Sequence, residues 1–284
     1  MWLKIDEAAR RLAACGIESA RLDAELLMAA AAGVTREAAV TGSIELSPAT
    51  LDNFETMIAR REKREPIAYL LGRKEFYSLD FEVSPAVLIP RPESEIVVDA
   101  ALEVIAGAPD ARVLDIGTGS GAIAIAIAVN AARVRVTGVD ISADAIAVAS
   151  RNARGHRVED RVTFRRGDCF ETLDGGPALG SFDVIVSNPP YLDEAEIPAL
   201  EPEVRGYEPR IALSAGAGGL DILRAIAAAA PRHLASDGEL IVEVAAGQAA
   251  AVAKLVEEAG LHLVSVINDL TGHPRVVRAR SSRA

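Results

Sequence analysis

The sequence is poor in the residues that build metal sites and disulfide frameworks. Its 284 residues include two cysteines, Cys15 and Cys169, and four histidines. The two cysteines lie far apart, and no paired Cys/His spacing typical of structural zinc is present. We therefore predict no metal site, and we expect both cysteines to be small buried side chains in a reducing compartment.

Basic charge and long apolar runs are scarce as well. Thirty Lys and Arg residues stand against 41 Asp and Glu residues, which gives a net charge of −11. An acidic chain is poorly suited to neutralising duplex phosphates, so no stable nucleic-acid binding is expected. The opening "MWLKIDEAARRL" places charges where a signal peptide needs an apolar core, and "AIAIAIAV" falls well short of the roughly 20 residues that cross a bilayer. We expect a cytoplasmic protein with no membrane segment.

Three regions differ in their hydrophobic pattern. Up to residue 74, stretches such as "ARLDAELLMAAAA" carry apolar residues at helical spacing, and Ser47 followed by Pro48 is typical of a helix start. This predicts a small helical domain over 1–74. "EFYSLDFEVS" alternates apolar and polar residues, which predicts a β-hairpin within a linker over 75–92. Pro92 and Glu93 are well suited to begin the next helix.

The remainder, 93–284, alternates strands with helices. Seven stretches have the character of strands: "RVLDIG", "VRVTGVD", "VTFRRGD", "FDVIVSN", "GELIVEV", "LHLVSVI" and "RVVRAR". Such alternation predicts an α/β fold with a mostly parallel sheet covered on both faces. Only "NDLTGHP" separates the last two strands, so we expect them to form an antiparallel hairpin at the sheet edge.

A glycine-rich turn follows the first of these strands, in "VLDIGTGSGAIAIAIA". A strand, a glycine turn and a helix start together predict a nucleotide-type cofactor site. The spacing is G-x-G-x-G instead of the dinucleotide G-x-G-x-x-G, which disfavours an NAD-dependent oxidoreductase. Asp115 would repel a pyrophosphate but suits a cationic ligand. The predicted cofactor contacts in the turn are Gly117, Thr118, Gly119, Ser120 and Gly121.

Acidic residues end the next two strands. Asp140 lies about 20 residues past the glycines, the usual distance for a carboxylate that binds ribose hydroxyls. Asp168 is placed to accept from an adenine amino group, with Cys169 or Phe170 against the purine face. This set indicates S-adenosylmethionine more than NAD. Taken singly, the turn could be only a tight connection, and Asp140 could instead cap the helix that begins near Ser142.

"VSNPPY" ends the fourth strand with two consecutive prolines. The Asn188 side chain and the Pro189 carbonyl offer two rigid acceptors, as a planar –NH₂ group needs, and Tyr191 could lie against that group. We predict Asn188, Pro189 and Tyr191 as catalytic, with Asn188 touching both cofactor and substrate. The alternative is a rigid turn, since Asn and Pro are common turn residues.

The sequence resembles the N5-glutamine methyltransferases that modify peptide chain release factors. The resemblance lies in "EPIAYLLGRKEFYSLDFEVSPAVLIPRPESE", "VLDIGTGSGAIAIAIA", "GVDISADAIAVASRNA", "FDVIVSNPPY" and "NDLTGHPRVV". It implies a Rossmann-like class I methyltransferase, with S-adenosylmethionine as methyl donor and S-adenosylhomocysteine as product. The substrate it implies is the GGQ glutamine of class I release factors, bound by a monomer. The helical domain over 1–74 is then expected to help dock this protein substrate. The glutamine is then held by Asn188, Pro189, Pro190 and Tyr191.

Some positions leave alternatives open. Arg91 and Glu93 in "IPRPESE" line the mouth of the substrate site in one interpretation and only start a helix in the other. Cys169 stands where many relatives have an aromatic residue. The tetrad and glycine turn also occur in adenine-N6 and guanine-N2 methyltransferases of nucleic acid, which remain the alternative function. A cofactor-binding subunit without catalysis is a further alternative.

Overall fold

Apolar residues at three- and four-residue spacing produce five helices at the start of the chain. The computed structural model describes residues 2–42, 46–108, 110–170 and 182–282. The helices are α1 (Trp2–Ala14), α2 (Ala20–Ala32), α3 (Arg36–Thr41), α4 (Pro48–Glu62) and α5 (Ile67–Leu71). The Ser47 hydroxyl accepts a hydrogen bond from the Thr50 amide at 3.1 Å, which confirms the predicted start of α4. Phe54 and Ile58 of α4 pack with Leu27 of α2 in the core of this bundle.

A distant segment joins these helices. The chain divides into two compact units, Met1–Arg73 with Leu200–Tyr207, and Lys74–Ala199 with Glu208–Ala284. In the first unit, Arg61 of α4 donates to Asp23 at 2.7 Å and to Glu203 of α9 (Pro202–Tyr207) at 2.9 Å. Arg61 and Asp23 are both buried, so each charge depends on its partner. The predicted domain boundaries after residues 74 and 92 stay a prediction.

Apart from Arg73, the predicted hairpin belongs to the second unit. Strands β1 (Arg73–Phe76) and β2 (Leu79–Glu82) form a two-stranded sheet. The helix expected at Pro92 begins as a 3₁₀ turn, η1 (Pro92–Ser94), and continues as α6 (Glu95–Ile105). This places Ser94 at the junction, where its side chain is buried.

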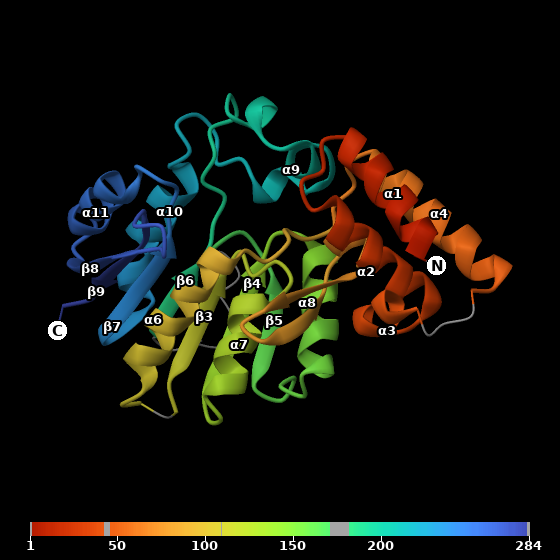
Figure 1. Cartoon of the computed structure of the whole chain (residues 1–284). Helices are drawn as coiled ribbons and strands as arrows, with labels where there is room; N and C mark the ends of the chain where they lie inside the picture. Colours follow the sequence, from red (N-terminus) through yellow and green to blue (C-terminus); the bar gives the residue numbers. More distant parts are fainter. Residues whose placement is uncertain (1, 43–45, 109, 171–181, 283–284) are drawn as a thin grey trace. The chain divides into compact units, whose positions relative to one another are not determined.

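A seven-stranded sheet forms the centre of this unit (Figure 1). Its order is β5-β4-β3-β6-β7-β9-β8. The strands are β3 (Arg112–Ile116), β4 (Arg135–Asp140), β5 (Val162–Arg166), β6 (Phe182–Ser187), β7 (Leu234–Glu243), β8 (His262–Asn268) and β9 (Pro274–Arg280). Because β6 pairs in parallel with β3, the tetrad after β6 and the glycine turn after β3 lie at the same sheet edge, as predicted.

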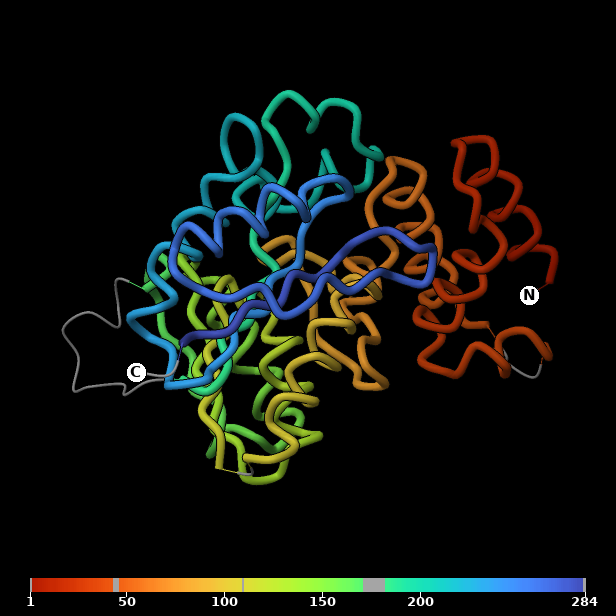
Figure 2. Tube along the Cα trace, turned by 90° about the vertical axis from the view of Figure 1, so that its left-hand side faces the viewer, coloured from red at the N-terminus to blue at the C-terminus, as the bar shows by residue number. Residues whose placement is uncertain are grey.

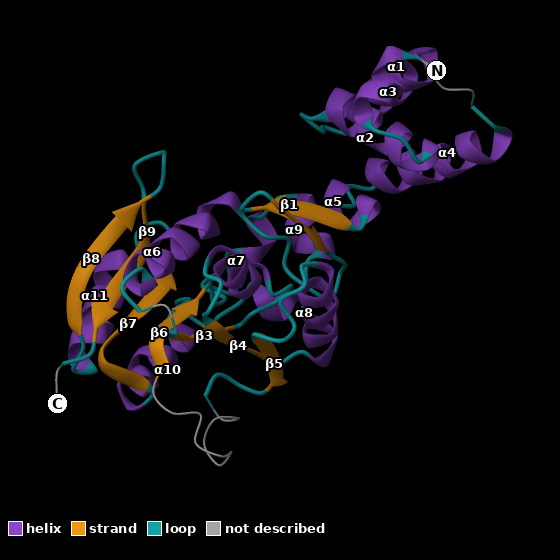
Figure 3. Cartoon of the chain, turned by 90° about the horizontal axis from the view of Figure 1, so that it is seen from below, coloured by secondary structure: helices purple, strands orange, loops and turns teal. Residues whose placement is uncertain are grey.

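Helices cover both faces of this sheet (Figure 3). Alternate strand residues are buried on opposite sides, as in Val113 and Leu114 of β3. One face packs against α6 and α7 (Ala122–Asn130), and the other packs against α10 (Asp221–Ala229) and α11 (Ala249–Glu258). Helix α8 (Ala143–Gly155) contacts β5, β4 and β2. Short 3₁₀ turns are η2 (Ile197–Ala199), η3 (Arg210–Ala212) and η4 (Ala230–Arg232).

The last two strands form an antiparallel ribbon, drawn as two neighbouring blue tubes in Figure 2. Strand β9 also pairs antiparallel with β7, so it lies between β7 and β8. This confirms the predicted edge hairpin. Among the described residues, no helix is both long and apolar enough to cross a membrane.

One prediction about the cysteines is wrong. Cys15 is exposed, because it follows the last residue of α1 in the turn that ends at Gly16. Cys169 is only half-buried and lies beside the cavity described below.

Candidate active site

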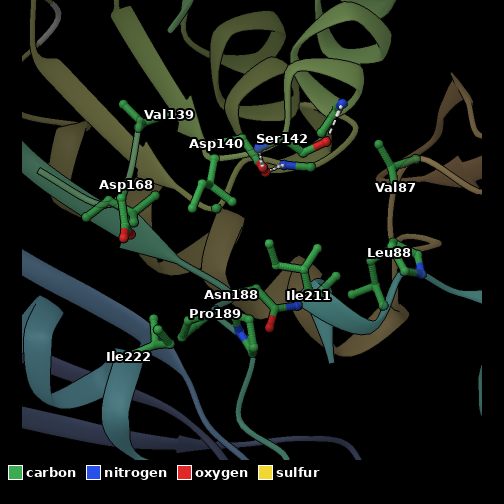
Figure 4. A pocket seen from close by; sticks show the side chains of 18 of the residues that line it. Val87, Leu88, Val139, Asp140, Ser142, Asp168, Asn188, Pro189, Ile211 and Ile222 are labelled. Carbon is green, nitrogen blue, oxygen red and sulfur yellow. Dashed lines mark hydrogen bonds between the residues drawn. The ribbon is translucent and has the colours of Figure 1, made fainter. Parts of the chain in front are cut away.

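A cavity of about 230 Å³ opens at the sheet edge where β3, β4, β5 and β6 end. Figure 4 shows Asp140 and Asp168 on one side of it and Asn188 and Pro189 on the other. All of its lining residues belong to the second unit. They are Ala86, Val87, Leu88, Ile116, Gly117, Gly119, Val139, Asp140, Ile141, Ser142, Ala145, Gly167, Asp168, Cys169, Asn188, Pro189, Pro190, Pro209, Ile211, Ala212, Ser214 and Ile222.

The glycine turn leaves room for a ligand at Gly119. Its φ is +55°, a conformation that L side chains rarely adopt, and a Cβ built there would meet no atom within 4 Å. Gly117 also lines the cavity, whereas Thr118, Ser120 and Gly121 do not. Their predicted role as cofactor contacts stays a prediction; in the structure they shape the turn.

Asp140 connects the turn to the next helix. Its carboxylate accepts hydrogen bonds from the Gly119 amide and from the Ser142 amide, each at 2.9 Å. The Ser142 hydroxyl itself accepts from the Ala145 amide, so Ser142 caps α8. Burial raises the pKa of Asp140, while the two amide donors oppose that rise. Asp140 thus lines the cavity in a position fixed by two backbone groups.

Asp115 is buried under the turn. One carboxylate oxygen accepts from the Thr118 hydroxyl at 2.6 Å, and the other, Oδ1, has no hydrogen-bond partner among the described residues. Burial raises the pKa of this carboxyl to about 7. An unpartnered buried acceptor beneath the glycine turn favours a cationic ligand above it, although Asp115 does not itself line the cavity.

The tetrad forms the opposite wall. Asn188, Pro189 and Pro190 line the cavity, and their predicted contacts with the substrate stay a prediction. The Asn188 amide nitrogen donates to the Ser94 hydroxyl at 2.8 Å. This bond leaves Oδ1 as the acceptor atom of the Asn188 side chain.

Tyr191 is placed differently from its neighbours in the tetrad. It does not line the cavity, and its ring packs on the apolar cluster between the sheet and α10 and α11. Gln248 holds its backbone, because the Gln248 amide nitrogen donates to the Tyr191 carbonyl at 2.9 Å. Burial raises the pKa of the Tyr191 hydroxyl to about 12, with the nearby Glu243 carboxylate as the next cause. The predicted contact of Tyr191 with substrate stays a prediction.

Arg91 and Glu93 also lie outside the lining of the cavity. The Arg91 guanidinium donates to Glu208 at 2.5 Å, and the Ile89 amide donates to the same carboxylate at 3.4 Å. Pro209, next to Glu208, lines the cavity, so this pair links the "IPRPESE" segment to one of its walls. The geometry favours a structural role for Arg91.

Phe170 and Cys169, the two alternatives for the purine face, are placed differently relative to the cavity. The Phe170 ring is buried and stacks on His233 with the ring centres 4.5 Å apart, away from the cavity lining. Cys169, one residue earlier, does line the cavity. Its predicted contact with the purine stays a prediction. Stacking on His233 accounts for the buried position of the Phe170 ring.

Several lining residues were not found from the sequence. Val87, Leu88, Ile211 and Ile222 supply apolar walls from segments that carry no polar motif. Ser94 contacts Asn188 from a position 94 residues away in sequence, which no local pattern indicates. In the described part of the chain, no cluster of three or more His, Cys, Asp or Glu side chains could hold a metal ion.

Two family models match the chain. The model described as the PrmC N-terminal domain matches residues 5–72. The model described as a methyltransferase domain matches residues 108–263, which is more than half of the chain.

Curated relatives match along nearly the whole length. A release factor glutamine methyltransferase from Geobacter sulfurreducens is 46% identical over 95% of this chain and 92% of its own. One from Pseudomonas aeruginosa is 44% identical over 91% of each chain. Among solved structures, a methyltransferase from Pyrococcus furiosus has a TM-score of 0.52 at 17% identity, covering 81% of this chain and 99% of its own, which supports the fold alone. The chain belongs to the release factor glutamine methyltransferase family.

Proposed function

We propose that this protein transfers a methyl group from S-adenosylmethionine to the side-chain amide nitrogen of the GGQ glutamine in class I peptide chain release factors. Relatives named release factor glutamine methyltransferase match almost the full chain, one of them at 46% identity, and this observation carries the proposal. The placement of Asn188 and Pro189 at the cavity supports it, because both residues offer oxygen acceptors to an –NH₂ group.

The residues at the cavity fit S-adenosylmethionine. Gly119 leaves open space where a side chain would stand, and Asp140 lies at the end of β4, where a ribose carboxylate is expected. The unpartnered oxygen of Asp115 suits a cationic group near the turn. Val139, Ile141 and Cys169 supply a surface for the purine. When bound, S-adenosylmethionine supplies a methyl group on a cationic sulfur and leaves as S-adenosylhomocysteine.

The chain's own groups orient the nitrogen that reacts. An amide nitrogen is a poor nucleophile because its lone pair is delocalised. Asn188 Oδ1 and the Pro189 carbonyl would each accept one of its protons, which fixes the plane of the amide and stabilises positive charge as it develops. The amide nitrogen can lose a proton after it has attacked the methyl group, so no base is needed before the attack.

Replacing Asp140 with Asn is expected to weaken binding of S-adenosylhomocysteine by about 10- to 100-fold. The substituted amide would turn its –NH₂ group toward one of the two backbone amides that Asp140 now accepts from. Isothermal titration with the purified chain measures this effect. Asp144→Asn is the matched control, because Asp144 is exposed on α8 and does not line the cavity. Equal losses of affinity in the two variants would contradict the assignment of Asp140.

Transfer of labelled methyl groups tests the proposed function. The purified chain is incubated with labelled S-adenosylmethionine and an intact class I release factor, the same factor with its GGQ glutamine replaced, or unmethylated duplex DNA. We expect label on the intact factor only. Label on DNA would favour the adenine or guanine alternative, and equal label on the glutamine-replaced factor would contradict the glutamine assignment.

A further inference from the structure

A buried carboxylate that lines no part of the cavity is connected to Asn188. Glu243 ends β7 and is 1% exposed. It accepts a hydrogen bond from the Ser94 hydroxyl at 2.6 Å, and the Ser94 oxygen accepts from the Asn188 amide nitrogen at 2.8 Å. Three residues from β7, η1 and the end of β6 thus form one chain of hydrogen bonds that ends at the cavity.

The available protons determine which group donates and which accepts in each of these hydrogen bonds. A serine hydroxyl has one proton, and an ionised carboxylate can only accept. The Ser94 proton is therefore committed to Glu243, and the Ser94 oxygen can only accept from Asn188. If the Asn188 amide were rotated by half a turn, its oxygen would face the Ser94 oxygen with no proton between them. Two buried oxygen atoms that face each other without a proton between them destabilise the folded protein.

We propose that Ser94 and Glu243 are positioning residues that hold the Asn188 amide oxygen toward the substrate, and so select glutamine over glutamate at the reacting position. This inference rests on the proposed function. A glutamine amide brings N–H donors to that oxygen. A glutamate carboxylate brings only acceptors, so it would leave the buried oxygens facing each other.

The surroundings of Glu243 make the arrangement sensitive to protonation. Burial raises the pKa of Glu243 to about 7. The Ser94 and Tyr191 hydroxyls and the positive charge of Arg275 on β9 oppose the rise, and the negative charge of Glu93 on η1 adds to it. A protonated Glu243 can donate to Ser94, which frees the Ser94 proton to bond the Asn188 oxygen. The orientation of the Asn188 amide is therefore fixed when the pH is above the pKa of Glu243, and it is no longer fixed when the pH is below that pKa.

Two substitutions interrupt the chain of hydrogen bonds. Glu243→Gln keeps the shape but can present either its amide oxygen or its –NH₂ group to Ser94, so position 243 no longer has to accept the Ser94 proton. Ser94→Ala removes the link between positions 243 and 188. The matched control is Glu239→Gln, because Glu239 is equally buried on the same strand but pairs with Arg278 and Arg280 instead of Ser94. The control therefore reports what loss of a buried carboxylate on β7 does without any change at Asn188.

The experiment measures binding of two release factors to the full chain in the presence of S-adenosylhomocysteine. One factor has the GGQ glutamine and the other has glutamate in its place. We expect the parent and Glu239→Gln to prefer glutamine by about tenfold or more, and Glu243→Gln and Ser94→Ala to prefer it by less than about threefold. A parent ratio near one, or an unchanged ratio in Glu243→Gln, would overturn the proposal.

A second readout follows the pH dependence of turnover. The ratio of parent to Glu243→Gln kcat should rise as the pH increases from about 6 to 8, because only the parent gains the ionised carboxylate. If the ratio of parent kcat to Glu243→Gln kcat stayed constant over this pH range, the proposal would be overturned, even if the two kcat values differed from each other. Absence of methyl transfer by the parent to the intact factor would overturn the proposed function, and this inference with it.

Discussion

Replacing Asn188 with Ala is expected to lower kcat for the release factor by about 10²- to 10³-fold. The substitution removes the side-chain oxygen that would orient the glutamine amide, and the Pro189 carbonyl cannot hold two protons in one plane. Asn188 is half-buried and contributes no apolar core contact, so the fold should persist. Single-turnover rates with saturating S-adenosylmethionine measure the effect on the chemical step directly.

Ser187→Ala is the matched control for Asn188→Ala. Ser187 precedes Asn188 on β6, is fully buried, and donates to the Ile116 carbonyl at 2.7 Å without lining the cavity. Its loss should lower stability by about 1 kcal/mol and change the rate by less than about threefold. If Asn188→Ala were as active as Ser187→Ala, the assignment of Asn188 to the reacting amide would be wrong.

Replacing Gly219 with Ala is expected to have the largest effect on stability, a loss of more than about 2 kcal/mol. Gly219 has φ +68°, and a Cβ built there would lie 2.3 Å from the Tyr191 carbonyl oxygen and 3.0 Å from the Gln248 amide nitrogen. The Tyr191 carbonyl oxygen belongs to the backbone, so it cannot move away by a rotamer change as a side chain could. The end of the tetrad would therefore move, and methyl transfer should fall together with the free energy of unfolding.

Gly218→Ala separates backbone strain from this contact. Gly218 has φ +79°, but a Cβ built there would meet no atom within 4 Å. Only the cost of a left-handed conformation remains, about 1 kcal/mol. Chemical unfolding of both variants measures the difference. Equal losses would mean that Gly219 matters for its conformation alone and not for its approach to Tyr191.

The elements that could be predicted are those whose signals are local. Apolar spacing identified the helix over Ala20–Ala32, and Ser47 with Pro48 identified the start of α4. Alternation of strands and helices predicted the parallel sheet, which placed the glycine turn beside the tetrad. The acidic residues at successive strand ends could be placed at the cavity for the same reason, because parallel strands end at one edge.

What could not be predicted depends on contacts between distant residues. Phe170 turns from the cavity because His233, 63 positions later, offers a stacking partner. Ser94 lies between Glu243 and Asn188 only in the folded chain, because the three residues are far apart in sequence. No local pattern indicates such a contact.

The most direct test of the central claim is to locate the methyl group. A class I release factor treated with the purified chain and S-adenosylmethionine is digested, and the GGQ peptide is fragmented in a mass spectrometer. We predict a single added methyl group on the glutamine side chain, absent after treatment with Asn188→Ala. A methyl group on any other residue, or an unmodified peptide from the parent reaction, would contradict the account.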